Sequence, residues 1–213
     1  MDLYFSPLAC SLATRISLYE AGADAGFIEV DPKTKRIMSD GSDYTKVYPL
    51  GMVPAIRMDD GALLTENAAI LQYVAAQFPD ANLAPKDGVA RARLQQWLCF
   101  IGTELHKALF VPLFDKKAPT GTAEHMLAKG ESRLAYLNDY LTGREFLLDH
   151  FTVADAYLYT VLNWSMATPV KFDRFPAIQA YFKRMQQRPS IAKAFGEELA
   201  LYKAELARHQ QAA

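Results

Sequence analysis

Residues 79–88 (PDANLAPKDG) are rich in types that interrupt helices and strands, and they separate two parts of the chain with different hydrophobic patterns. Before this segment, short apolar runs alternate with helix-like stretches. After it, the apolar residues recur at helical spacing. The chain of 213 residues is long enough for two cores. We therefore predict an α/β domain over residues 1–80 and an all-α domain over residues 88–213.

The first part of the chain predicts a small mixed sheet flanked by helices. Its elements follow in the order strand, helix, strand, irregular segment, strand, strand, helix: 3–5, 11–22, 27–30, 31–51, 53–58, 62–64 and 66–78. The hairpin signature Asp59-Asp60-Gly61 requires the last two strands to be antiparallel, whereas the helical connection allows the first two to be parallel. This arrangement is typical of thioredoxin-like domains.

The second part predicts only helices, separated by Pro and Gly residues: 89–114, 122–141, 152–166, 177–187 and 190–207. We expect most of their aromatic residues, among them Phe110, Tyr157 and Trp164, to be buried in the core, although a few could line an apolar pocket. The sequence Thr152-Val153-Ala154-Asp155 resembles a capping box, which we assign to helix initiation.

The composition excludes several classes of protein. Hydrophobic residues make up 51% and charged residues 22%, a globular balance, and the net charge of −1 gives no basic excess for a nucleic-acid partner. Two cysteines make no disulfide framework, which favours a cytoplasmic location. No run of about 20 apolar residues predicts a membrane span. The four histidines are scattered, so we expect no metal site.

Cys10 follows the first strand and lies near the start of the first helix. Free N–H groups at a helix start favour an anion, so we expect the thiol pKa to fall. A fall from about 8.5 to 6.5 would raise the thiolate fraction at pH 7 from about 3% to about 75%. The alternative is a small buried apolar residue, the usual environment of cysteine.

Two further motifs could bind a peptide-like ligand. A cis bond between Val53 and Pro54 would leave the main chain of Val53 free to pair with an extended peptide, although a trans bond is far commoner. Glu66 and Asn67, at a helix start after a strand, match the ammonium and carboxylate of an α-amino acid. The alternative for this second motif is an ordinary acidic helix cap.

The helix over residues 89–114 carries a polar cluster around His106. Thr103, His106 and Lys107 are expected on one helix face, and the imidazole can carry or accept a proton near neutral pH. A solvated helix face is the alternative.

Taken in order, SPLACSLA, GMVPAI, LTENAAI, residues 97–107 and HFTVADAYLY resemble the glutathione S-transferases, and among them the cysteine-bearing bacterial beta class. The resemblance covers essentially the whole chain. It implies a thioredoxin-like domain, an all-α domain, a homodimer without metal, and a glutathione site at the domain junction.

The resemblance also implies roles for individual residues. Cys10 would face the glutathione sulfur, Val53 before cis Pro54 would pair with the cysteinyl unit, and His106 would assist Cys10 in catalysis. The other glutathione contacts would be Lys35 at the glycyl end, Glu66 and Asn67 at the γ-glutamyl end, and Cys99, Thr103, Glu104 and His106 on the long helix. Tyr157, Trp164 and Phe110 would line the pocket for a small apolar electrophile.

The chain departs from the family pattern at several positions. Phe5 stands where a tyrosine is frequent, Cys99 replaces an asparagine, and Leu50 and Met52 make one rim of the site more apolar. We predict a glutathione transferase that conjugates apolar electrophiles and exchanges thiols through Cys10. The alternatives are a non-catalytic binding or regulatory module and a catabolic glutathione-dependent dehalogenase, ring-cleaving enzyme or thiol transferase.

Overall fold

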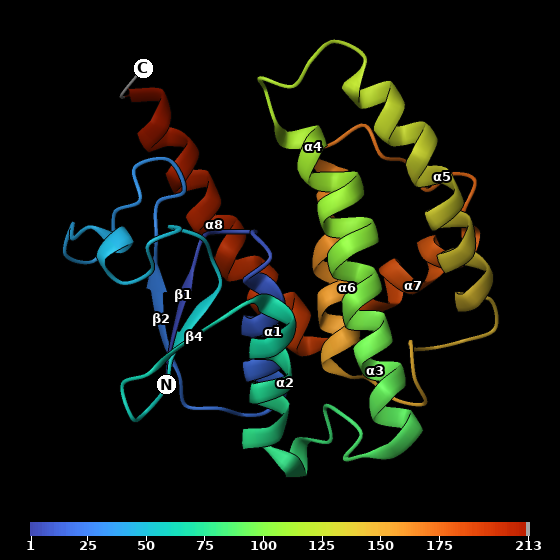
Figure 1. The fold of residues 1–213 in the computed structure, drawn as a ribbon, viewed down its shortest axis with the longest axis horizontal. Coiled ribbons are helices and arrows are strands. Elements are labelled where there is room, and N and C mark those ends of the chain that lie inside the picture. Colours follow the sequence, from blue (N-terminus) through green and yellow to red (C-terminus); the bar gives the residue numbers. More distant parts are fainter. Residues whose placement is uncertain (212–213) are drawn as a thin grey trace. The chain divides into compact units, whose positions relative to one another are not determined.

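The computed structural model describes residues 1–211, and they form two compact units. The first unit joins Met1–Leu83 to the last helix of the chain, and the second is Ala84–Arg188. The last helix, α8 (Pro189–Gln211), packs on α1 (Leu12–Glu20), beside which it runs in Figure 1. The domain expected over residues 88–213 included this helix, whose contacts place it with the first unit instead.

The first unit contains the mixed sheet that the sequence predicts. Its strands are β1 (Asp2–Phe5), β2 (Gly26–Glu29), β3 (Ala55–Arg57) and β4 (Leu63–Thr65), in the spatial order β2-β1-β3-β4. The pair β1–β2 is parallel and the pair β3–β4 is antiparallel, in agreement with the prediction. The antiparallel pairing of β3 with β1 was not predicted. Because β1 is an interior strand, the residues that follow it leave the sheet between its two neighbours, β2 and β3.

Each face of this sheet has its own core. On one face Leu3, Phe5 and Ile56 pack with Ile70 and Val74 of helix α2 (Asn67–Gln77). On the other face Tyr4, Val30, Ile37, Tyr44 and Ala55 form a second cluster. Two of its residues come from the irregular segment over residues 31–51, whose regular part is one 3₁₀ turn, Tyr44–Lys46. This segment is therefore a structural layer of the unit.

Charged and polar side chains fasten α8 to α1. Arg15 Nη1 lies 3.2 Å from Glu197 Oε2, and the same carboxylate accepts a hydrogen bond of 2.5 Å from the Tyr19 hydroxyl. The Ser190 hydroxyl donates to Glu20 near the start of α8. These contacts were not visible in the sequence, because they join residues about 180 positions apart that follow no spacing rule.

The second unit consists of helices. Its first helical rod combines α3 (Gly88–Phe100), a π-helical segment (Ile101–Phe110) and α4 (Val111–Phe114), and it continues into α5 (Thr122–Leu141), α6 (Val153–Asn163) and α7 (Pro176–Gln186). A short 3₁₀ turn at Pro79–Ala81 is near the end of Met1–Leu83 in the first unit, and another lies at Trp164–Met166 in the second. Helix α6 is buried along its whole length, so it forms the centre of this unit.

The π-helical segment is a departure from the single α-helix that we expected over residues 89–114. At its end the Val111 N–H donates to the His106 carbonyl, five residues back. Pro112 follows directly, and proline lacks the N–H that would continue an α-helical ladder. Wider hydrogen-bond spacing before a proline is one way to keep the rod continuous.

Helix α6 begins with the capping box that the sequence predicts. The buried carboxylate of Asp155 accepts hydrogen bonds from the Thr152 N–H and hydroxyl, at 2.9 and 3.0 Å. It also accepts from the Leu147 N–H at 2.9 Å and the Tyr181 hydroxyl at 3.0 Å. One side chain thus fixes the helix start, the preceding loop and α7.

By length and composition alone, the rod Gly88–Phe114 could cross a membrane, and 39% of its apolar window is buried inside the protein. A core helix of a globular domain meets the same criterion. The rod packs against α5 and α6 within its own unit, which accounts for much of its apolar character.

Candidate functional site

The thiol of Cys10 lies beside the motif that contains Pro54. Helix α1 starts at Leu12, and two tight-turn hydrogen bonds precede it: Leu12 N–H to the Ala9 carbonyl at 3.0 Å and Ala13 N–H to the Cys10 carbonyl at 3.2 Å. Cys10 is partly buried, and its Sγ donates to the Val53 carbonyl at 3.2 Å. The structure therefore brings together two motifs that are 43 residues apart in the sequence.

The peptide bond between Val53 and Pro54 is cis, as the family resemblance implies. Strand β3 begins one residue later, at Ala55, so Val53 is at the entrance of a strand and outside its ladder. The preceding carbonyl, of Met52, accepts a hydrogen bond of 2.9 Å from the buried Tyr44 hydroxyl. Through this hydrogen bond, the irregular segment over residues 31–51 holds the main chain next to Val53.

Lys35 reaches the same region of the first unit. It is partly buried, and its aliphatic stem lies against Gly51, where an added Cβ would come within 3.2 Å of the Lys35 Cδ. Gly51 also has a φ of +59°, a conformation that side chains rarely adopt. Glycine at this position therefore allows a long cation to lie over the chain two residues before Val53.

Glu66 precedes α2 in an uncommon backbone conformation, with φ 67° and ψ 114°. Its carbonyl accepts from the Ala69 and Ile70 N–H groups, both at 2.9 Å, while its side chain is exposed. The first N–H groups of a helix have no acceptor within the helix and can face an anion. Backbone strain of this kind is frequently found where a chain presents groups to a ligand.

Asn67 is positioned differently from the expectation. Its side chain is buried and faces α1, where its Oδ1 accepts from the Thr14 hydroxyl at 3.2 Å. Within residues 1–211 its Nδ2 has no hydrogen-bond partner. The carboxamide therefore ties α2 to α1 while it keeps one unsatisfied donor, a group that natural proteins seldom leave buried.

His106 lies in the π-helical segment of the second unit and is only 7% exposed. Its Nδ1 is 2.7 Å from the Tyr157 hydroxyl, and its ring meets the Trp164 ring edge-on at 4.8 Å. Burial, helped by the charge of Lys107, lowers the pKa of His106 to about 4. The imidazole is therefore neutral at pH 7, in contrast to the expected change of charge near neutral pH.

The other polar residues of this helix do not share the environment of His106. Thr103 and Lys107 are exposed, because the π-helical spacing separates them from the buried face. Cys99 is exposed and its carbonyl accepts from the Thr103 hydroxyl at 3.0 Å. Glu104 pairs with Arg133 of α5 at 2.7 Å.

Aromatic rings surround Trp164. Phe110 and Phe114 both meet its ring edge-on, at 5.9 and 5.8 Å. Phe110 is fully buried and Trp164 nearly so, which makes Phe110 a core residue in this structure. Val111, Phe114 and Met166, which are close in sequence to Phe110 or Trp164, have exposed apolar side chains. No sequence motif indicated a ligand at Val111 or Met166.

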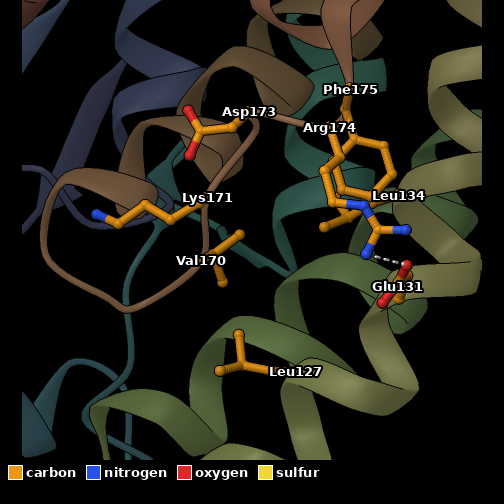
Figure 2. Close-up of a pocket in the computed structure, with 8 residues that line it drawn as sticks. All are labelled: Leu127, Glu131, Leu134, Val170, Lys171, Asp173, Arg174 and Phe175. Carbon is orange, nitrogen blue, oxygen red and sulfur yellow. Dashed lines mark ion pairs between the residues drawn. The ribbon is translucent and has the colours of Figure 1, made fainter.

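Two cavities of the second unit lie away from these clusters. One, of about 210 Å³, lies between α5 and residues 170–175, and Figure 2 shows Glu131 and Arg174 paired at its edge above the apolar Leu127. The other, of about 670 Å³, is lined by the end of α5 and the start of α7. None of the predicted site residues lines either cavity. Residues 1–211 also hold no group of three potential metal ligands.

Comparison with known sequences decides the family. The family model for the glutathione S-transferase N-terminal domain matches residues 9–77, and the model for the C-terminal domain matches residues 101–189. The chain belongs to the glutathione S-transferase family. Glutathione S-transferase GstA of Escherichia coli O157:H7 is 42% identical over 200 residues, which cover 93% of this chain and 98% of that protein.

Solved structures of family members agree with this assignment. A sphingomonad glutathione S-transferase complexed with glutathione is 40% identical with a TM-score of 0.88, and a bacterial beta class enzyme of Sphingomonas chungbukensis is 41% identical with the same score. Each comparison covers 93% of this chain and 98% of the other. The fold and the beta-class likeness inferred from the sequence motifs are therefore confirmed.

Proposed function

We propose that this transferase binds reduced glutathione on its first unit, with the glutathione sulfur beside Cys10, and that it both conjugates apolar electrophiles and exchanges thiols. The observation that carries this proposal is the contact between the Cys10 thiol and the Val53 carbonyl. It places a nucleophilic atom next to main-chain groups that can pair with an extended peptide.

The other proposed glutathione contacts of the first unit are those that the family resemblance implies. The γ-glutamyl group would interact with Glu66, the start of α2 and Asn67, and the glycyl carboxylate with Lys35. On the second unit Cys99, Thr103, Glu104 and His106 remain proposed contacts. In the tautomer in which Nδ1 of the neutral His106 accepts from the Tyr157 hydroxyl, Nε2 carries the proton and can donate a hydrogen bond to an anionic sulfur.

Thiol exchange would proceed in two displacements. The Cys10 thiolate attacks the glutathione sulfur of a mixed disulfide, forms a disulfide with glutathione, and releases the other thiolate, which takes a proton. A second glutathione thiolate then attacks the glutathione sulfur of this intermediate, which releases oxidised glutathione and regenerates the Cys10 thiolate. In conjugation the glutathione thiolate forms a bond to the electrophilic carbon, and the leaving group departs with the electron pair.

Substitution of Cys10 tests the role of the thiol. Cys10→Ala and Cys10→Ser should abolish exchange with a glutathione mixed disulfide, while calorimetry should still detect glutathione binding. Undiminished exchange by Cys10→Ala would show that another group is the nucleophile. No binding heat at millimolar glutathione in the unmodified protein would favour a non-catalytic module. A crystal soaked in glutathione would measure the distance between the two sulfur atoms.

We also propose that the protein is a cytoplasmic homodimer with a role in detoxification. The exposed Leu50 and Met52 give the first unit apolar surface that a second copy could cover. Light scattering should give twice the mass of 23.8 kDa at micromolar concentration. A stable monomer under these conditions would contradict the dimer.

A further inference from the structure

The loop that carries Cys10 contains a residue in an unfavourable backbone conformation. Leu8 has a φ of 58°, in the left-handed region that only glycine and a few polar residues enter readily. Such a conformation persists where surrounding contacts enforce it. The Leu8 N–H, two residues before the thiol, makes a contact with a distant part of the chain.

That contact is made by Glu198 of α8. The Leu8 N–H donates to Glu198 Oε2 at 2.7 Å, and the two residues are 190 positions apart in the sequence. The Glu198 side chain is fully buried. Loss of this acceptor would leave a partly buried N–H without its hydrogen-bond partner, which is costly.

Glu198 is itself held in a charged and aromatic environment. Its Oε1 lies 3.1 Å from Arg15 Nε, and the Arg15 guanidinium lies 4.2 Å from the ring centres of both Phe5 and Phe27. Burial raises the pKa of Glu198 to about 8, against the opposing effects of Arg15 and the Leu8 N–H. The acidic groups that act on it are Glu197 and Glu29, which also raise its pKa.

The two ends of the loop have separate anchors. The Ser6 hydroxyl donates to the Val30 carbonyl at 2.6 Å, and the Ser11 hydroxyl donates to the Ser6 carbonyl at 3.3 Å. Ala9 N–H closes a turn on the Ser6 carbonyl at 3.1 Å. Glu198 therefore acts on the loop at Leu8, between the Ser6 and Ser11 anchors.

We propose that Glu198 is a positioning residue for the Cys10 nucleophile: by accepting the Leu8 N–H, it holds the loop in the conformation that sets the thiol beside the Val53 carbonyl. This inference rests on the proposed role of Cys10 in thiol exchange. It gives the last helix of the chain a part in the chemistry of a residue near its beginning.

Four variants separate the acceptor from packing and charge. Glu198→Met fills a similar volume without an oxygen, Glu198→Gln keeps an acceptor oxygen but cannot ionise, and Glu198→Asp keeps an ionisable carboxyl group but withdraws it from Leu8. Glu197→Gln is the matched control, because Glu197 also contacts Arg15 but not Leu8. For each variant, mass spectrometry would follow alkylation of Cys10 by iodoacetamide against pH, together with exchange on a glutathione mixed disulfide and the melting temperature.

We expect Glu198→Met and Glu198→Asp to slow disulfide exchange at least about tenfold and to change the pH profile of Cys10 alkylation, because the thiol would no longer be held beside the Val53 carbonyl. Glu198→Gln should stay within about threefold of the unmodified protein and Glu197→Gln within about twofold, because both keep the Leu8 acceptor. If Glu198→Met does not fold, the comparison of Glu198→Asp, which lacks the Leu8 acceptor, with Glu198→Gln, which keeps it, tests the proposal.

Three outcomes would overturn the inference: unchanged exchange and alkylation in folded Glu198→Met or Glu198→Asp, a Glu198→Gln variant as impaired as Glu198→Asp, or an equal effect of Glu197→Gln. Failure of the proposed function is distinguishable, because the unmodified protein would then show no exchange. The alkylation profile of Cys10 would still report whether Glu198 positions the thiol.

Discussion

The stability of the protein should depend on pH through His106. The pKa of this imidazole is about 4 in the folded chain and 6.5 in an unfolded one, because folding buries it beside Lys107. Between these values the unfolded state binds the proton more tightly, so stability is fully present above pH 6.5 and falls as the pH decreases toward 4. At pH 5 the difference of 1.5 pKa units corresponds to about 2 kcal/mol.

The matched variant for this measurement is His106→Asn, whose carboxamide can still pair with the Tyr157 hydroxyl but does not titrate. Urea denaturation at pH 7.5 and pH 5 would give the free energy of unfolding of both proteins. The unmodified protein should lose about 2 kcal/mol more than the variant, since all other titrating groups are common to both. Equal losses, or an NMR titration of His106 with a midpoint near 6.5, would refute the conclusion that this imidazole is buried and neutral.

Two further predictions concern packing and capping. Gly130→Ala on α5 should destabilise the protein by about 1 kcal/mol, because the added Cβ would meet Leu109 Cδ1 at 2.5 Å. Gly196→Ala on α8 should instead stabilise it by up to about 1 kcal/mol, because no atom lies within 4 Å of the added Cβ and alanine favours the helix. Thermal denaturation of the two variants would show equal effects if the contact with Leu109 were unimportant. Asp155→Asn should lower the free energy of unfolding by about 2–4 kcal/mol, because the new amide N–H group would face the N–H and hydroxyl donors of Thr152. The control, Asp149→Asn at an exposed position, should change it by no more than about 0.5 kcal/mol. Denaturant unfolding that gave similar values for the two aspartates would contradict this role of Asp155.

The sequence determined the order and type of the elements, because hydrophobic spacing and breakers are local properties of the chain. The β3–β4 pairing followed from the hairpin at Asp59-Asp60-Gly61, and the helical connection after β1 allowed the parallel β1–β2 pair. The β1–β3 pairing became known only from the structure. The capping box at Thr152 and Asp155 was recognisable from the sequence, since its partners are three residues apart. The helix expected over residues 89–114 contains Pro112, and no sequence pattern indicated the ten-residue π-helical segment before it.

Only the tertiary structure decided the environments of the site residues. The distance from Cys10 to the Val53 carbonyl, the burial of His106 against Tyr157, and the orientation of Asn67 toward Thr14 all depend on packing between distant segments. The same holds for Glu198, which no motif distinguishes from Glu197 beside it. Local sequence specifies which groups a segment carries, whereas the dielectric environment and hydrogen-bond partners of those groups are set by residues that folding brings from elsewhere in the chain.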